Sequence, residues 1–139
     1  TTGDPWFDTK FDCFWYNKEP NWGTFNPEYN DNPSLDRDDI DGWGPENLNI
    51  NIPEENTTYR VGVHYWNDHG FGDSLATIRV YVYGVLETEI VDVPMTNHDM
   101  WFAAEIPWVA GTTQTKVLKD ENDEYLITPN YQNPMFLSQ

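Results

Sequence analysis

Basic residues are scarce in this sequence. Lysine and arginine together number 7 against 24 aspartates and glutamates, which gives a net charge of −17 over 139 residues. Nucleic-acid recognition needs the opposite field, because cationic side chains hold the phosphate backbone. Docking to an anionic membrane surface is disfavoured for the same reason. We therefore do not expect this protein to bind nucleic acid.

Cysteine and long apolar runs are also missing. Cys13 is the only cysteine, so no intrachain disulfide framework is expected. A lone cysteine is expected to pack as a small apolar side chain rather than to act as a nucleophile. No apolar run approaches the roughly 18 residues of a membrane-spanning helix, so we expect no membrane insertion. The start at Thr1–Asp4 is that expected of a processed chain or of a domain cut from a longer protein.

Helical periodicity is nearly absent, and an alternation with a period of two takes its place. Gly84 is expected to turn the chain between two such alternating segments and so to close a hairpin. No helix of useful length is expected. The predicted strands, in order, are Phe11–Tyr16, Leu48–Ile52, Tyr59–Trp66, Thr77–Tyr83, Val85–Val91 and Met100–Ile106, followed by a last hairpin that pairs Gln114–Leu118 with Tyr125–Thr128.

About eight short strands joined by turn-rich loops predict an all-β fold, an antiparallel β-sandwich of the jelly-roll or immunoglobulin-like kind. The 7 Trp, 8 Tyr and 7 Phe argue against the disorder that acidity alone would suggest. We expect one domain over residues 1–128 and a C-terminal tail over 129–139. Residues 17–45 are expected to form a long acidic loop without a strand. This composition indicates a rigid, exported domain that is extracellular or at the cell surface.

One segment concentrates the negative charge. Residues 35–47 read LDRDDIDGWGPEN, with Arg37 as the only base. Two like charges about 6 Å apart repel by roughly 3 kcal/mol at an effective dielectric of about 20. The glycines and the proline favour a tight turn, which keeps the carboxylates from separating. A bound Ca²⁺ would remove this cost, because it takes carboxylate and carbonyl oxygens as ligands. The plain alternative is a solvated acidic loop.

The predicted ligands are carboxylates of this segment, supported by the residues that follow it. An EF-hand is excluded, because aligning Gly42 with the required glycine places Arg37 and Leu48 at the two end positions. Three aspartates from other loops, Asp12, Asp31 and Asp68, are candidates to complete the shell. The metal-binding prediction covers Asp36, Asp38, Asp39 and Asp41, with Glu46 and Asn47 as weaker candidates.

Enzymatic activity is not expected. The motifs HExxH and GxSxG and the phosphate-binding glycine loops are all absent. Asp68 and His69 would suit an acid–base pair, but no nucleophile motif accompanies them. The three histidines, His64, His69 and His98, lack the spacing of a zinc site.

Glycan binding is the alternative function. Exposed tryptophan and tyrosine rings flanked by aspartate and asparagine are typical of surfaces that stack on sugars. Trp22 and Trp43 both lie in glycine-rich loops and are the candidate residues. The plain alternative is that such rings fill the core or hold long loops in place.

The order of motifs resembles the YfaP-like domains of unknown function, which are modules of large secreted or surface proteins of bacteria. The resemblance implies a β-sandwich with an acidic, metal-binding loop and no established catalysis. It covers most of the chain and rests on DCFWYNKEPNWG (12–23), NPSLDRDDIDGWGPENLNI (32–50), YRVGVHYWNDHG (59–70), ATIRVYVYG (76–84) and the segment 101–108.

The chain departs from that family at its start. Members usually open with an Asp-rich strand of the form DLDLHL, and Thr1–Asp12 contains none. The resemblance implies that this strand precedes the sequence, comes from the C-terminal tail or comes from another copy. In the last case, strand donation would make the chain a subunit of a surface polymer or filament. We expect a non-enzymatic, calcium-stabilised domain with a structural or adhesive role, whose partner is a copy of itself or a glycan.

Overall fold

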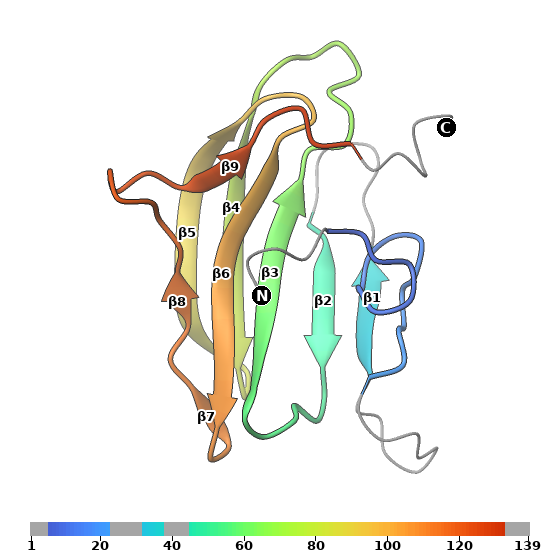
Figure 1. The fold of residues 1–139 in the computed structure, drawn as a ribbon, viewed down its shortest axis with the longest axis vertical. Coiled ribbons are helices and arrows are strands. Elements are labelled where there is room, and N and C mark those ends of the chain that lie inside the picture. The colour runs from blue at the N-terminus through green and yellow to red at the C-terminus, as the bar shows by residue number, and fades with distance from the viewer. Residues whose placement is uncertain (1–5, 23–31, 38–44, 133–139) are drawn as a thin grey trace. The chain divides into compact units, whose positions relative to one another are not determined.

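The computed structural model describes residues 6–22, 32–37 and 45–132, which form strands and turns without a helix (Figure 1). The chain forms two compact units, Thr1–Glu55 and Asn56–Gln139. Several antiparallel sheets are present, so the predicted all-β sandwich class is confirmed. The predicted boundaries, one domain over 1–128 and a tail over 129–139, stay a prediction.

The described part of the first unit contains one two-stranded sheet. Its strands are β1 (Pro33–Arg37) and β2 (Asn47–Ile50), which pair antiparallel. The rest of this part is turns, with one isolated bridge between Phe14 and Asn17. In these turns, side chains often accept the backbone N–H groups that a neighbouring strand would otherwise bind. The Asp8 carboxylate, for example, accepts the N–H groups of Lys10 and Phe11.

The second unit contains two sheets that enclose its core. In one sheet, β6 is central and pairs with β3 on one side and with three short strands on the other. The other sheet is the hairpin of β4 and β5. The strands are β3 (Thr57–His64), β4 (Ser74–Val82), β5 (Val85–Met95), β6 (Met100–Val109), β7 (Thr112–Thr113), β8 (Lys116–Val117) and β9 (Leu126–Thr128).

The core of the second unit lies between these two sheets. Trp101 on β6 is fully buried and meets the ring of Tyr125 edge-on, with the centroids 5.6 Å apart. Burial alternates along β4, where Ile78 is buried between the exposed Thr77 and Arg79, as the period-two pattern predicts, whereas β6 is buried on both faces. The buried cluster comprises Ile78, Ile90, Val93, Met95, Trp101 and Ala103.

Two tight turns lie at the hairpin ends of this unit. Tyr83 and Gly84 join β4 to β5 with φ of 50° and 77°, and Ala110 and Gly111 join β6 to β7 with φ of 54° and 70°. Two consecutive positive φ values define the type I′ turn, which matches the twist of the strands. The Tyr83 hydroxyl donates to the Gly111 carbonyl at 2.9 Å and so joins the two turns. The Gly84 hairpin was predicted, whereas the Ala110–Gly111 turn was not.

Three details of the predicted strand pattern were wrong. Phe11–Tyr16 is not a strand, because carboxylates cap its turns. β1 lies inside the segment 17–45, which was predicted as a loop; it pairs with β2 and its Leu35 is buried. The last two strands both pair with β6 and meet each other only through the bridge Lys119↔Tyr125.

Candidate functional site

The hairpin of β1 and β2 brings together the two ends of the acidic segment. Arg37 is the register partner of Asn47, so residues 38–46 connect two paired positions. One extra residue, Asp36, lies on β1 between the pairs Leu35↔Leu48 and Arg37↔Asn47. Such a bulge bends a strand locally and redirects its side chains. The acidic segment therefore begins and ends at one end of a short ladder.

The Asp36 carboxylate is the centre of a polar cluster on this hairpin. The Ser34 hydroxyl donates to its Oδ1 at 2.7 Å, and the Asn47 amide donates to its Oδ2 at 3.3 Å. The Asn49 amide also donates to Oδ2. Leu35, by contrast, is buried. The alternation in SLD and NLNI thus separates a polar from an apolar set.

This polar cluster has the chemistry of a cation site as well as of a hydrogen-bonded network. Each of the three donors also carries an oxygen atom, and a half-turn of an asparagine amide exchanges its N–H₂ group for its carbonyl oxygen. The hydroxyl of Ser34 would then lie beside Oδ1 of Asp36, and two amide carbonyls would lie beside Oδ2. Hard cations such as Ca²⁺ accept such oxygen ligands. Ser34 and Asn49 were not among the predicted ligands.

The other predicted ligands divide into described and undescribed residues. Glu46 lies directly before β2 and is exposed. Asp38, Asp39 and Asp41 lie outside the described residues, as does Asp31. Asp12 caps a turn by accepting the N–H of Asp8 at 2.9 Å. Among the residues that the structure describes, no three His, Cys, Asp or Glu side chains gather into a metal-binding group.

Trp22 contributes to the order of the first unit. Its indole N–H donates to the Phe11 carbonyl at 2.5 Å, and its backbone N–H donates to the Asn32 side chain at 2.8 Å. This half-buried ring therefore joins three segments of the unit, the role expected of a loop-holding tryptophan. Its predicted glycan contact stays a prediction. Trp43 lies outside the described residues.

Cys13 is half-buried and its thiol donates to the Lys18 carbonyl at 3.4 Å. Burial, together with the nearby charges of Asp36, Glu19 and Asp12, raises the pKa of this thiol to about 11. A thiol with such a pKa is protonated at neutral pH and is a poor nucleophile. The environment fits the predicted structural role of the lone cysteine.

The loop that follows β3 is held by several hydrogen bonds. The Asp68 N–H donates to the Asn97 side chain at 2.9 Å, and the Asp68 carboxylate accepts the Gly70 N–H at 2.9 Å. The Tyr65 hydroxyl donates to the Gly72 carbonyl at 2.6 Å. Asp68, considered above as a metal ligand or as half of an acid–base pair, thus caps a turn.

This ordered loop presents two aromatic rings. Phe71 is 91% exposed and Trp66 is 48% exposed, and the ring of His69 meets Trp66 edge-on at 6.2 Å. Two large exposed apolar rings on one ordered loop make this loop a candidate contact surface. The sequence analysis predicted exposure for Trp22 and Trp43 and not for Trp66. The order of this loop depends on a hydrogen bond to Asn97, which is distant in the sequence.

His64 ends β3 in a half-buried position. Its Nε2 lies 2.7 Å from the Tyr131 carbonyl, and the two rings meet edge-on. Burial lowers the pKa of His64; the bond to Tyr131 opposes this shift and the nearby His98 adds to it. Tyr131 also donates its N–H to the His98 carbonyl at 2.8 Å. These contacts attach the chain after β9 to the end of the sandwich in the second unit.

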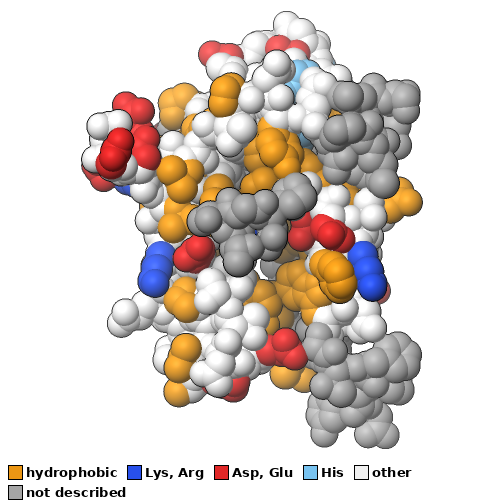
Figure 2. All heavy atoms as spheres, viewed as in Figure 1, with side chains coloured by type: hydrophobic (Ala, Val, Ile, Leu, Met, Phe, Trp, Pro, Cys, Tyr) orange, Lys and Arg blue, Asp and Glu red, His pale blue; other side chains and the backbone are white. Residues whose placement is uncertain are grey.

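Acidic side chains are distributed over the visible face in Figure 2, where basic side chains are isolated. No helix in the described residues is long and apolar enough to cross a membrane.

Comparisons with protein-family models, with curated proteins and with solved structures gave no match. The YfaP-like resemblance therefore stays a prediction from sequence motifs.

Proposed function

We propose that this protein is an extracellular, calcium-stabilised β-sandwich with a structural or adhesive role and without catalytic activity. The observation that supports it best is the β1–β2 hairpin, which holds the two ends of an acidic segment at paired positions. Asp36 lies at the bulge of this hairpin, among side chains that all carry oxygen. Self-association at a cell surface or in a filament is part of the proposal.

The proposed role of calcium is to stabilise the folded hairpin by mass action. An ion that binds only the folded state raises stability by RT ln(1 + [L]/Kd), about 2.7 kcal/mol at a hundredfold excess over Kd. The ion also offsets the repulsion among neighbouring carboxylates. The ligands would be Asp36 with Asp38, Asp39 and Asp41.

The test is thermal unfolding with a chelator and with calcium restored. We expect the chelated protein to melt several degrees lower and added Ca²⁺ to restore the melting temperature. Asp38→Ala combined with Asp41→Ala leaves the hydrogen bonds of Asp36 in place, so it should melt like the chelated wild type and should not respond to Ca²⁺. A melting temperature that is the same with and without chelator would refute the calcium role.

A matched control is available in another acidic turn. Asp120 accepts the N–H groups of Asn122 and Glu124, so it caps this turn. Asp123→Ala in this turn removes an exposed carboxylate, and the calcium response should remain. Terbium luminescence excited through tryptophan gives a direct readout of binding, because Trp43 is two positions from Asp41 in the sequence.

A second candidate function, glycan binding, is favoured by the loop with Trp66 and Phe71. Its rings are exposed on ordered backbone, and Asn67, Asp68 and Asp73 lie beside them in the sequence. A glycan array would test it: binding should disappear in Trp66→Ala and Phe71→Ala and persist in Trp22→Phe. Binding that survives both loop substitutions would exclude this site.

A further inference from the structure

The smaller sheet of the second unit leaves a long strand edge without a partner. β4 pairs with β5 on one side, and no other strand of the described residues pairs with it. β6, in contrast, has partners on both sides. The unpaired N–H and C=O groups of an edge strand readily accept a strand from another chain.

β5 has features that protect an edge, whereas β4 does not. Both register shifts of the hairpin add their extra residue to β5, at Asp92 and at Glu87. β5 also contains Pro94, and bulges, prolines and charges all hinder edge-to-edge pairing. The β4 sequence SLATIRVYV is regular, rich in apolar and β-branched residues and free of proline.

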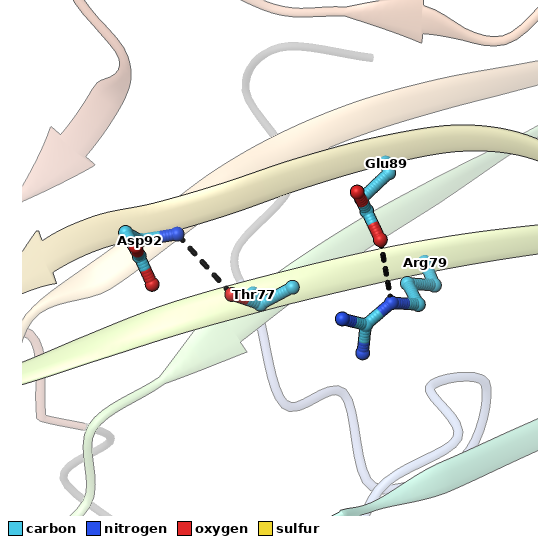
Figure 3. A network of polar contacts seen from close by, with 4 residues as sticks. All are labelled: Thr77, Arg79, Glu89 and Asp92. Atoms are coloured by element: carbon cyan, nitrogen blue, oxygen red, sulfur yellow. Dashed lines mark hydrogen bonds and ion pairs between the residues drawn. The ribbon is translucent and has the colours of Figure 1, made fainter.

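The one charge on β4 is compensated within the hairpin. Figure 3 shows Arg79 of β4 beside Glu89 of β5, with its Nε 2.6 Å from the carboxylate. The same view shows the bulge residue Asp92, whose N–H donates to the Thr77 hydroxyl at 3.2 Å. The outward side of β4 is thus neutral in a chain of net charge −17. It also exposes Leu75 and Tyr81, at 61% and 59%.

We propose that two copies of this chain pair through β4, antiparallel and centred on Ile78, so that the two hairpins form one four-stranded sheet. In this register Leu75 lies opposite Tyr81 of the second copy, Thr77 opposite Arg79, and Ile78 opposite Ile78. On the inward face Ile78 meets Ile78 and Ala76 meets Val80, and on the outward face Leu75 meets Tyr81. The contact is isologous, so the same surface serves both copies and the assembly closes as a dimer.

Other registers fit this strand less well. A shift that changes the parity would place inward residues opposite outward ones. A register centred on Arg79 keeps the faces but places the two guanidinium groups directly opposite, and such like-charge pairs are destabilising. The pairing centred on Ile78 avoids both problems.

This inference rests on the self-association in the proposed function, to which it assigns a closed dimer rather than a filament, and not on calcium. It has its own salt dependence, because two chains of like charge repel at long range and added salt screens that repulsion. The dimer should therefore strengthen as ionic strength rises.

The experiment is sedimentation equilibrium over a range of protein and salt concentrations. Leu75→Glu with Tyr81→Glu places two glutamates opposite each other at two positions and should give a monomer. Leu75→Lys with Tyr81→Glu places opposite charges there and should restore the dimer. The matched control is Leu86→Glu with Val91→Glu, which adds the same charge at exposed apolar positions of β5 and should leave the dimer intact.

A disulfide tests the register. In a Cys13→Ser background, protein with Thr77→Cys is mixed with protein with Arg79→Cys under mild oxidation. In the proposed pairing, the Cα atoms of residue 77 in one copy and residue 79 in the other are about 4.5–5.5 Å apart, a distance that a disulfide spans. The mixture should give more crosslinked dimer than either variant alone.

A wild type that stays monomeric at every salt concentration would overturn the proposal, as would a doubly glutamate-substituted variant that still dimerises. The circular dichroism spectrum of that variant should match the wild type, and the restored dimer of the charge-paired variant excludes misfolding as the cause. If chelation leaves the melting temperature unchanged while the dimer persists, the calcium role fails and the β4 pairing stands.

Discussion

The two units of the chain are ordered by different interactions. In the second unit, buried residues of two sheets form a continuous apolar cluster around Trp101. In the described part of the first unit, the buried apolar side chains are Phe14, Pro20, Pro33 and Leu35, and many hydrogen bonds run between side chains and backbone. The free energy of apolar burial follows the buried area and does not require charged groups, whereas exposed polar contacts between charged groups are weakened by salt. The first unit should therefore be the more sensitive to its ionic surroundings.

The largest expected effect is in the core of the second unit. Trp101→Ala should lower the free energy of unfolding by about 3–5 kcal/mol, because it removes a fully buried ring and leaves a cavity. Denaturant unfolding measures this loss. The control Trp66→Ala removes a half-exposed ring and should cost far less. Equal costs for the two would mean that the apolar cluster does not dominate this unit.

In the first unit the largest effect should come from Asp36. Asp36→Ala removes the acceptor of three hydrogen bonds, each worth about 0.5–1.5 kcal/mol when well formed and less when exposed. We expect faster amide hydrogen exchange in β1 and β2 and a loss of about 1 kcal/mol. Asp36→Asn keeps the shape and one oxygen, so it should retain much of the protection without calcium. Unchanged exchange in Asp36→Ala would argue against this cluster as the support of the hairpin.

Trp22 offers a smaller test of the same comparison. Trp22→Phe keeps an aromatic ring but removes the indole N–H that reaches the Phe11 carbonyl, at a cost of about 1 kcal/mol. Hydrogen exchange or limited proteolysis of residues 6–22 should detect the change. Trp15→Phe is the control, because that ring is exposed. Equal effects of the two substitutions would remove Trp22 from the interactions that order this unit.

The same division decides how much the sequence could predict. Period-two alternation located β3, β4 and β6 to within a few residues, and the turn at Gly84 located β5 as the partner of β4. It failed at Phe11–Tyr16, where carboxylates of Asp8 and Asp12 satisfy backbone N–H groups and form turns instead. It also missed β1, whose five residues were hidden by the surrounding prolines and aspartates.

The candidate site was predictable only in part, for a related reason. The acidic segment is evident from charge alone, but the partners of Asp36 follow from the register of β1 against β2. Asn49 lies 13 positions from Asp36, and only the pairing of the strands brings them together. Likewise, the order of the loop with Trp66 and Phe71 depends on Asn97, which belongs to another turn. Contacts between distant positions need a topology before they can be predicted.

The smallest expected effect tests whether the second unit also uses a polar contact, at His64. Burial makes the charged imidazole costly in the folded state, so its pKa is lower there than in the unfolded chain. As pH falls, the unfolded chain binds the proton first. The contribution to stability is therefore full above the ordinary histidine pKa of 6.5 and is lost as pH falls through that value toward the lower folded pKa.

Thermal melts from pH 7 downward should show this decline in stability, and His64→Gln should make it shallower. His69→Gln, at an exposed position, should leave the slope as in the wild type. A slope that His64→Gln does not change would show that the contact with Tyr131 is indifferent to protonation, and the contrast between an apolar second unit and a polar first unit would then be sharper.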